Sequence, residues 1–132
     1  ADRQEGTEMG DRMRFLMTLC AGLLGAAGVA LAAVAAHRVN DPALATAAPL
    51  MVMHATAALA IVALAGRCTR PLAWTIAALL LLAGAALFSG DISLRAFTGN
   101  RLFPLAAPTG GSTMIAGWLM VALASLLELR DR

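Results

Sequence analysis

Four polar residues lie in or beside long apolar runs of this sequence: His37, His54, Asp91 and Arg95. Polar side chains within a bilayer are energetically unfavourable, so their presence needs a structural or functional reason. Two imidazoles and a carboxylate are possible metal ligands, and imidazole also exchanges protons near neutral pH. We treat these four residues as one candidate polar cluster.

Asp91 and Arg95 are four residues apart, a spacing that places their opposite charges on one face of a helix. Pairing protects an acid that would otherwise be protonated or mispaired at the hydrocarbon boundary. A structural ion pair is the simpler interpretation, and contact with an ion or a lipid headgroup is the alternative.

His37 and His54 match no compact metal motif, such as two histidines four residues apart on one helix. Their position favours hydrogen bonds that tie neighbouring helices together. Metal binding and proton or quinone handling are the alternatives. We expect no bound metal and no cofactor.

Thr109, Gly110 and Gly111 precede the last apolar run. Exposed N–H groups at a helix start bind anions, so a lipid-headgroup contact is one interpretation of this segment. A plain turn is the other.

Motifs of soluble enzymes are missing. The sequence has no nucleophile elbow, P-loop, CxxC pair or haem-attachment motif. Cys20 and Cys68 are too few and too far apart for a disulfide framework. We expect Cys20 to be a small buried apolar group, Cys68 to be an ordinary loop thiol, and the protein to be non-catalytic.

The composition indicates a membrane protein. Hydrophobic residues make up 60% of the 132 residues and charged residues 14%, with a mean hydropathy of +0.77. Soluble domains are about half apolar and a quarter charged. The net charge of +2 comes from arginine without lysine, and so small an excess does not indicate nucleic-acid binding.

The apolar runs predict four transmembrane helices at about residues 15–37, 48–66, 71–97 and 109–129, since about 20 apolar residues span a bilayer. The predicted fold is an all-α integral membrane protein, an antiparallel four-helix bundle with short loops. We expect residues 1–14 to form a polar arm, residues 130–132 a tail and residues 102–108 a re-entrant or interfacial segment. Four antiparallel spans bring the candidate polar cluster and residues 109–111 to one membrane face.

Small residues recur at spacings typical of helix contacts in lipid. Because apolar burial drives no association there, small side chains matter by letting backbones approach. The predicted packing positions are Gly22, Gly25, Gly28, Ala86, Gly90 and Gly117.

Arginine counts predict the orientation. The N-terminal arm, the second loop and the C-terminus carry 7 arginines against 3 in the other two connections. The positive-inside rule then places both termini on the cytoplasmic or matrix side.

Several short blocks resemble a known family: residues 24–28 with Ala36-His37, then His54-Ala55, then residues 87–91, and finally residues 107–111 with 116–118. They resemble the YgdD-like family, small inner-membrane proteins grouped as domain of unknown function 423 and similar to transmembrane protein 256. The resemblance implies a four-helix protein of bacterial or mitochondrial inner membranes without an assigned activity. The chain departs from the family's pattern at Arg38, Pro49 and residues 51–53.

The sequence therefore favours an accessory or structural subunit, or an assembly factor, of a larger respiratory or other energy-transducing membrane complex. Its expected partners are membrane lipids and other membrane-protein subunits, with no nucleic acid and no soluble substrate. The alternative is a small oligomeric transporter or a lipid- or ion-binding protein that uses His37, His54, Asp91 and Arg95.

Overall fold

The computed structural model describes residues 2–37 and 41–131, with side chains from residue 10 onward. This part of the chain consists of helices joined by loops. The helices are α1 (Asp2–His37), α2 (Pro42–Ala65), α3 (Pro71–Thr98) and α4 (Ala106–Arg130). All four contain a stretch long and apolar enough to cross a membrane. The predicted fold class is confirmed: this is an all-α, multi-pass membrane protein.

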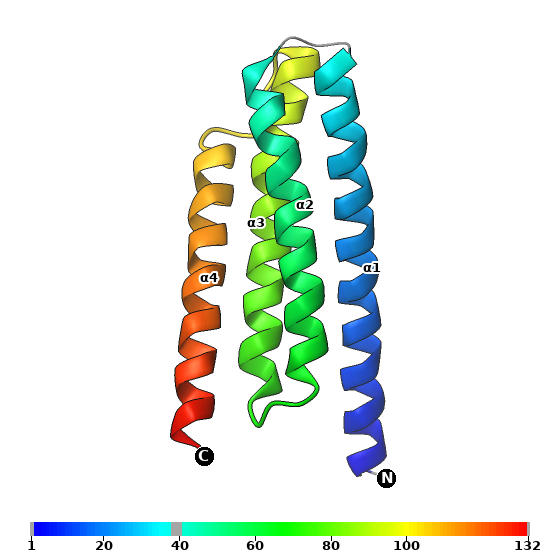
Figure 1. Cartoon of the computed structure of the whole chain (residues 1–132), viewed down its shortest axis with the longest axis vertical. Coiled ribbons are helices and arrows are strands. Elements are labelled where there is room, and N and C mark those ends of the chain that lie inside the picture. Colours follow the sequence, from blue (N-terminus) through cyan, green and yellow to red (C-terminus); the bar gives the residue numbers. More distant parts are fainter. Residues whose placement is uncertain (1, 38–40, 132) are drawn as a thin grey trace.

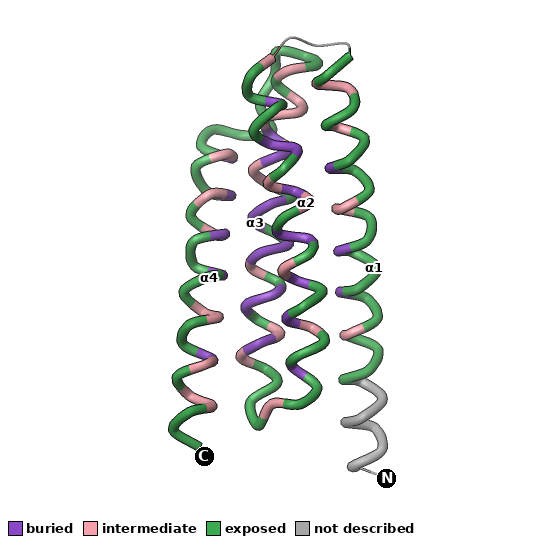
Figure 2. The backbone as a smooth tube through the Cα atoms, in the orientation of Figure 1, coloured by how far each residue is buried: buried purple, intermediate pink, exposed green. Residues whose placement is uncertain are grey.

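The helices run antiparallel, with α2 and α3 at the centre and α1 and α4 on the flanks (Figure 1). α1 packs mainly on α2 and only lightly on α3, whereas α4 packs on α3. The buried residues concentrate on α2 and α3 (Figure 2). Both outer helices therefore expose most of their apolar surface to the surrounding lipid.

Three helices, α1, α2 and α4, begin earlier than predicted. The segment expected as a polar arm continues the first span, because α1 is helical from Asp2. α2 begins at Pro42 rather than near residue 48, since Asp41 is its N-cap and accepts a 2.8 Å hydrogen bond from the Ala43 N–H. Proline at the first helical position suits such a start. Pro49 consequently lies inside α2, which a transmembrane helix tolerates when its neighbours satisfy the backbone.

The predicted re-entrant segment is divided between a loop and a helix. Gly99 ends α3 in the left-handed region at φ 75°, and its N–H donates to the Arg95 carbonyl. The chain then folds back along α3 until α4 begins at Ala106, three residues before the predicted start. Pro108 lies in the first turn of α4, where its missing N–H has no intrahelical partner to lose.

The α1–α2 contact uses part of the predicted glycine stripe: Gly28 faces α2, and a Cβ placed on Gly25 would lie 3.7 Å from the Ala55 Cβ. Met17, Ala21 and Gly28 are buried, and a Cβ placed on Gly28 would lie 2.9 Å from the Met51 Cβ. Nothing lies within 4 Å of a Cβ on Gly22. Residues three apart rotate by about 60° around a helix, so Gly22, Gly25 and Gly28 cannot all face one neighbour.

The α3–α4 contact is built on close backbone approach at three glycines. A Cβ on Gly84 would lie 2.8 Å from the Gly110 carbonyl oxygen, and a Cβ on Gly110 would lie 2.8 Å from the Gly84 carbonyl oxygen. A Cβ on Gly117, a predicted packing position, would meet the Leu81 side chain at 2.7 Å. Reciprocal approach of this kind allows Cα–H groups to contact carbonyl oxygens across the interface.

The predicted Ala86 and Gly90 pair does not join two helices. Ala86 is exposed on α3, and the neighbour of Gly90 is the Leu102 side chain of the α3–α4 loop, at 3.7 Å from a Cβ placed there. Gly90 therefore accommodates the returning loop.

The flanking helices supply charges to the ends of the central pair. The Arg14 guanidinium lies over Gly66 at the C-terminal end of α2. The Glu128 carboxylate accepts the N–H groups of Thr69 and Arg70 at the start of α3, at 3.1 and 2.9 Å. A cation at a helix C-terminus and an anion at an N-terminus both oppose the helix dipole favourably.

Beside this contact, the Arg70 Nε–H donates to Asp131 at 2.6 Å. This bond and the guanidinium charge hold the pKa of Asp131 below its usual range. The α2–α3 loop is thereby fastened to the C-terminal end of α4.

Replacing Gly110 with alanine should destabilise the protein by about 1–3 kcal/mol, because the new methyl group would require the α3 and α4 backbones to separate. Thermal unfolding in detergent measures the change. The matched control is Gly22→Ala, which should be neutral or stabilising by up to about 1 kcal/mol through helix propensity. Equal effects of the two substitutions would contradict the proposed role of close backbone contact.

Candidate functional site

The structure distributes the candidate polar cluster over three places. Asp91 and Arg95 remain together near the end of α3, His54 lies deep in the bundle, and His37 is exposed at the end of α1. The ends of α1 and α3 do lie at the same end of the molecule (Figure 1). The ends of α1 and α3 therefore lie together as predicted, but the side chains of the candidate polar cluster do not contact one another as a single group.

Asp91 holds the α3–α4 loop. Its side chain is only 1% exposed, and one carboxylate oxygen accepts the Leu102 N–H at 2.9 Å. The other oxygen accepts a hydrogen bond from Arg95 Nη2 at 3.1 Å. The predicted ion pair is present, and its acid has a second structural role as the anchor of the loop.

A buried serine supports the same end of the bundle. Ser89 is fully buried, and its hydroxyl donates to the Ala47 carbonyl of α2 at 3.2 Å. One turn later the Ser93 hydroxyl donates back to the Ser89 carbonyl at 2.6 Å. The Ser89–Ala47 bond attaches α3 to α2 two residues before the loop anchor.

Arg95 also borders a small polar cleft between the start of α2 and the end of α3. The cleft has a volume of about 250 Å³ and is lined by Asp41, Ala43, Ile92, Arg95 and Ala96. Its two charged groups have opposite signs, so it presents no concentrated charge to an ion.

His54 forms a hydrogen-bonded pair with Trp118 of α4. Its ring is 4% exposed, with Nδ1 2.8 Å from the Leu50 carbonyl and Nε2 3.2 Å from Trp118 Nε1. Since an indole N–H can only donate, Nε2 must accept and Nδ1 must carry the proton. His54 is therefore a neutral imidazole that ties α2 to α4, as the hydrogen-bonding interpretation of the histidines predicted.

The expected convergence of His54 with Asp91 is wrong. Trp118 follows Gly117, which packs on Leu81, so His54 lies at the level of Leu81. Asp91 is ten residues further along α3, about 15 Å at 1.5 Å per residue. The discrepancy arises because α2 begins at Pro42, which places His54 three turns into the helix rather than one.

The predicted position of residues 109–111 at a helix entrance is wrong. They lie within α4, where Gly110 is buried against Phe88 and Gly84 of α3. Thr109 is exposed and Gly111 half-buried. The plain-turn alternative is wrong as well, since the segment is helical and Gly110 has a packing role.

The chain matches a family described as "Protein of unknown function (DUF423)" over residues 31–111. The chain belongs to this family. The resemblance found in the sequence is thereby confirmed. No solved structure matches the chain.

The matched DUF423 region runs from the last turns of α1 to the first turns of α4. It contains His37, His54, Asp91 and Gly110, so the loop anchor and the α3–α4 contact both lie inside it. Trp118, the partner of His54, lies beyond the matched region.

Three contributors were not predicted from the sequence: the Leu102 N–H, Trp118 as the partner of His54, and the Gly84–Gly110 contact. The sequence does contain a pattern that indicates the face of α4 packed against α3. Gly110, Gly117 and Ala124 recur every seven residues, and all three are buried. A backbone donor in a loop leaves no comparable pattern.

Within residues 10–37 and 41–131, no three His, Cys, Asp or Glu side chains lie close enough to share a metal ion. Cys20, expected to be buried, is instead exposed. α1 packs only lightly on α3, so the Cys20 side chain lines an open groove beside Leu82 of α3.

Substituting Asp91 with alanine should release the α3–α4 loop, because both the Leu102 N–H and Arg95 lose their acceptor. We expect hydrogen exchange at the Leu102 amide to accelerate by about tenfold, as for loss of a hydrogen bond to a charged group. Asp91→Asn retains an amide oxygen for Leu102 and should have an intermediate effect. An unchanged exchange rate in Asp91→Ala would refute the anchor role.

A double-mutant cycle should detect the His54–Trp118 bond. His54→Leu and Trp118→Phe should show a coupling energy of about 0.6–1.7 kcal/mol, the range for hydrogen bonds between transmembrane helices. Unfolding in detergent provides the measurement. As a control, the effects of Trp118→Phe and Ser93→Ala on the free energy of unfolding should be additive. Additive effects of His54→Leu and Trp118→Phe would show that the His54–Trp118 bond contributes nothing to stability.

Proposed function

We propose that this protein is a non-catalytic accessory or structural subunit, or an assembly factor, of a larger membrane complex, with a respiratory or other energy-transducing complex as the favoured setting. The observation that carries the proposal is an open apolar groove between α1 and α3, lined by three small side chains and three leucines. Such a surface is suited to a transmembrane helix of another subunit.

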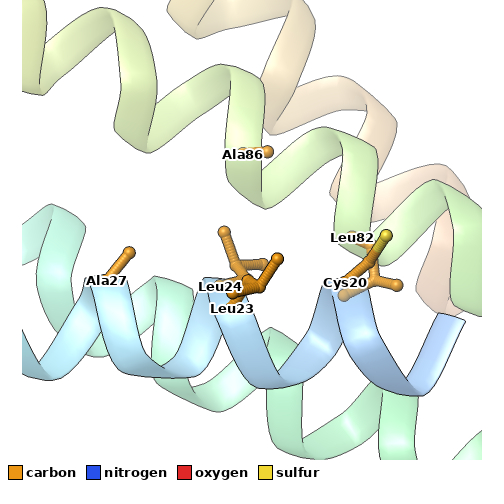
Figure 3. Close-up of a pocket in the computed structure, with 6 residues that line it drawn as sticks. All are labelled: Cys20, Leu23, Leu24, Ala27, Leu82 and Ala86. Carbon is orange, nitrogen blue, oxygen red and sulfur yellow. The ribbon is translucent and has the colours of Figure 1, made fainter. Parts of the chain in front are cut away.

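The groove exists because α1 packs on α2 but only lightly on α3. It has a volume of about 360 Å³, and Figure 3 shows the side chains that line it. Cys20 and Ala27 of α1 and Ala86 of α3 contribute small groups, and leucines form the remaining wall. Small residues permit the close backbone approach from which helix association in lipid gains its energy.

The engagement of the buried polar groups supports a non-catalytic role. Asp91, His54 and Ser89 are all buried, and each one bonds another part of the same chain. A catalytic or transport site needs polar groups that can exchange partners with a substrate. Here these groups join α2, α3, α4 and the α3–α4 loop.

We place the protein in a bacterial or mitochondrial inner membrane, as its family resemblance implies, and the arginine distribution supports an orientation with both termini on the cytoplasmic or matrix side. Among the residues whose side chains the structure describes, five arginines lie at the end that holds the termini and the α2–α3 loop: Arg12, Arg14, Arg67, Arg70 and Arg130. Arg95 and Arg101 lie toward the other end. Basic residues near transmembrane ends favour the cytoplasmic side.

A photocrosslinking amino acid at Ala27 or Ala86 should capture one defined membrane protein in the native membrane, whereas the same probe at Ala122 should not. Ala122 lies on the exposed surface of α4, so it matches the groove positions in residue type and lipid exposure. Adducts identified by mass spectrometry provide the measurement. Capture of lipid alone at all three positions, with a free monomer in mild detergent, would refute the proposal.

Filling the groove offers a second measurement on the same surface. Ala27→Trp should reduce co-purification of the captured partner at least about tenfold, a change typical of one disrupted central interface contact. Ala122→Trp should leave co-purification unchanged.

A further inference from the structure

A second groove runs between the beginning of α3 and the end of α4, at the end of the molecule that holds the termini. It has a volume of about 410 Å³, and its deeper walls are formed by Leu72, Ala73, Ile76, Met120 and Leu127. Thr69 and Arg70 also line it. Because both precede α3, they lie where the groove meets the headgroup layer.

Asp131 fixes Arg70 at this mouth. Arg70 donates through Nε at 2.6 Å and through Nη2 at 3.2 Å to the two carboxylate oxygens. An arginine has five N–H donors, so three remain for another acceptor. A guanidinium held by one partner also loses less side-chain entropy when it binds a second group.

The acids near Arg70 are already engaged. Glu128 accepts hydrogen bonds from Thr69 and from the Arg70 backbone N–H. Asp131 is paired with the Arg70 side chain. Arg67 and Arg130 lie at the same end of the molecule and add two positive charges to the headgroup layer there.

We propose that this groove binds an anionic phospholipid, with its phosphate at Arg70 and the upper part of one acyl chain between α3 and α4. The groove combines a cation at the membrane surface with apolar walls below it, which matches the order of groups along such a lipid. From Arg70 to Ile76 the groove descends about 9 Å, less than half of a 30 Å hydrocarbon core. The site therefore belongs to one leaflet, and it is separate from the partner groove between α1 and α3.

Native mass spectrometry of the full chain tests this site with phosphatidylglycerol and phosphatidylcholine of identical acyl chains. The protein should retain phosphatidylglycerol with about a fivefold preference, the size expected for one basic residue at a headgroup layer. Arg70→Gln should abolish the preference. Arg67→Gln also removes one positive charge, but outside the groove, and should preserve most of the preference for phosphatidylglycerol.

Two further variants separate the site from general surface charge and from misfolding. Asp131→Asn keeps Arg70 and should preserve or increase the preference, whereas Ala73→Leu fills the groove without changing charge and should reduce retention of both lipids. Thermal unfolding of each variant identifies any that fails to fold. The proposal would be overturned if Arg67→Gln and Arg70→Gln reduced the preference for phosphatidylglycerol equally. It would also be overturned if a folded Ala73→Leu variant retained both lipids as well as the unchanged protein does.

Discussion

Helices surrounded by lipid gain little from burying apolar side chains against one another, because lipid tails are equally apolar. Their association depends instead on close backbone contact and on polar bonds that cannot be replaced by water. The Gly84–Gly110 contact supplies the first, and the bonds of Asp91, Ser89 and His54 supply the second. The arrangement of α2, α3 and α4 depends on these contacts.

The same constraint explains why the buried polar residues are bonded within the protein. A carboxylate or imidazole in hydrocarbon needs a partner, and each residue here has at least one partner in a different segment. Asp91 joins α3 to its following loop, Ser89 joins α3 to α2, and His54 joins α2 to α4. Each bond therefore fixes the relative position of two elements.

The open arrangement of the outer helices produces both grooves. α1 is held mainly by α2, which leaves space between α1 and α3. α4 follows α3 closely at Gly84, Gly110 and Gly117, and the second groove opens near their ends beside Arg70. One groove is lined by small residues and leucines, while the other has a cation at its mouth. These differences support a partner helix for the first and an anionic lipid for the second.

The sequence by itself determined the number of spans, the all-α class, the family and the Asp91–Arg95 pair, because hydropathy and helical spacing are local properties. It also indicated that His54 ties helices together. Only the tertiary structure decided that Trp118 is its partner, that Leu102 is held by Asp91, and that Gly110 packs on α3. These contacts depend on the axial alignment of helices distant in sequence. The start of α2 at Pro42 rather than residue 48 shifts that alignment by almost two turns, which separated His54 from Asp91.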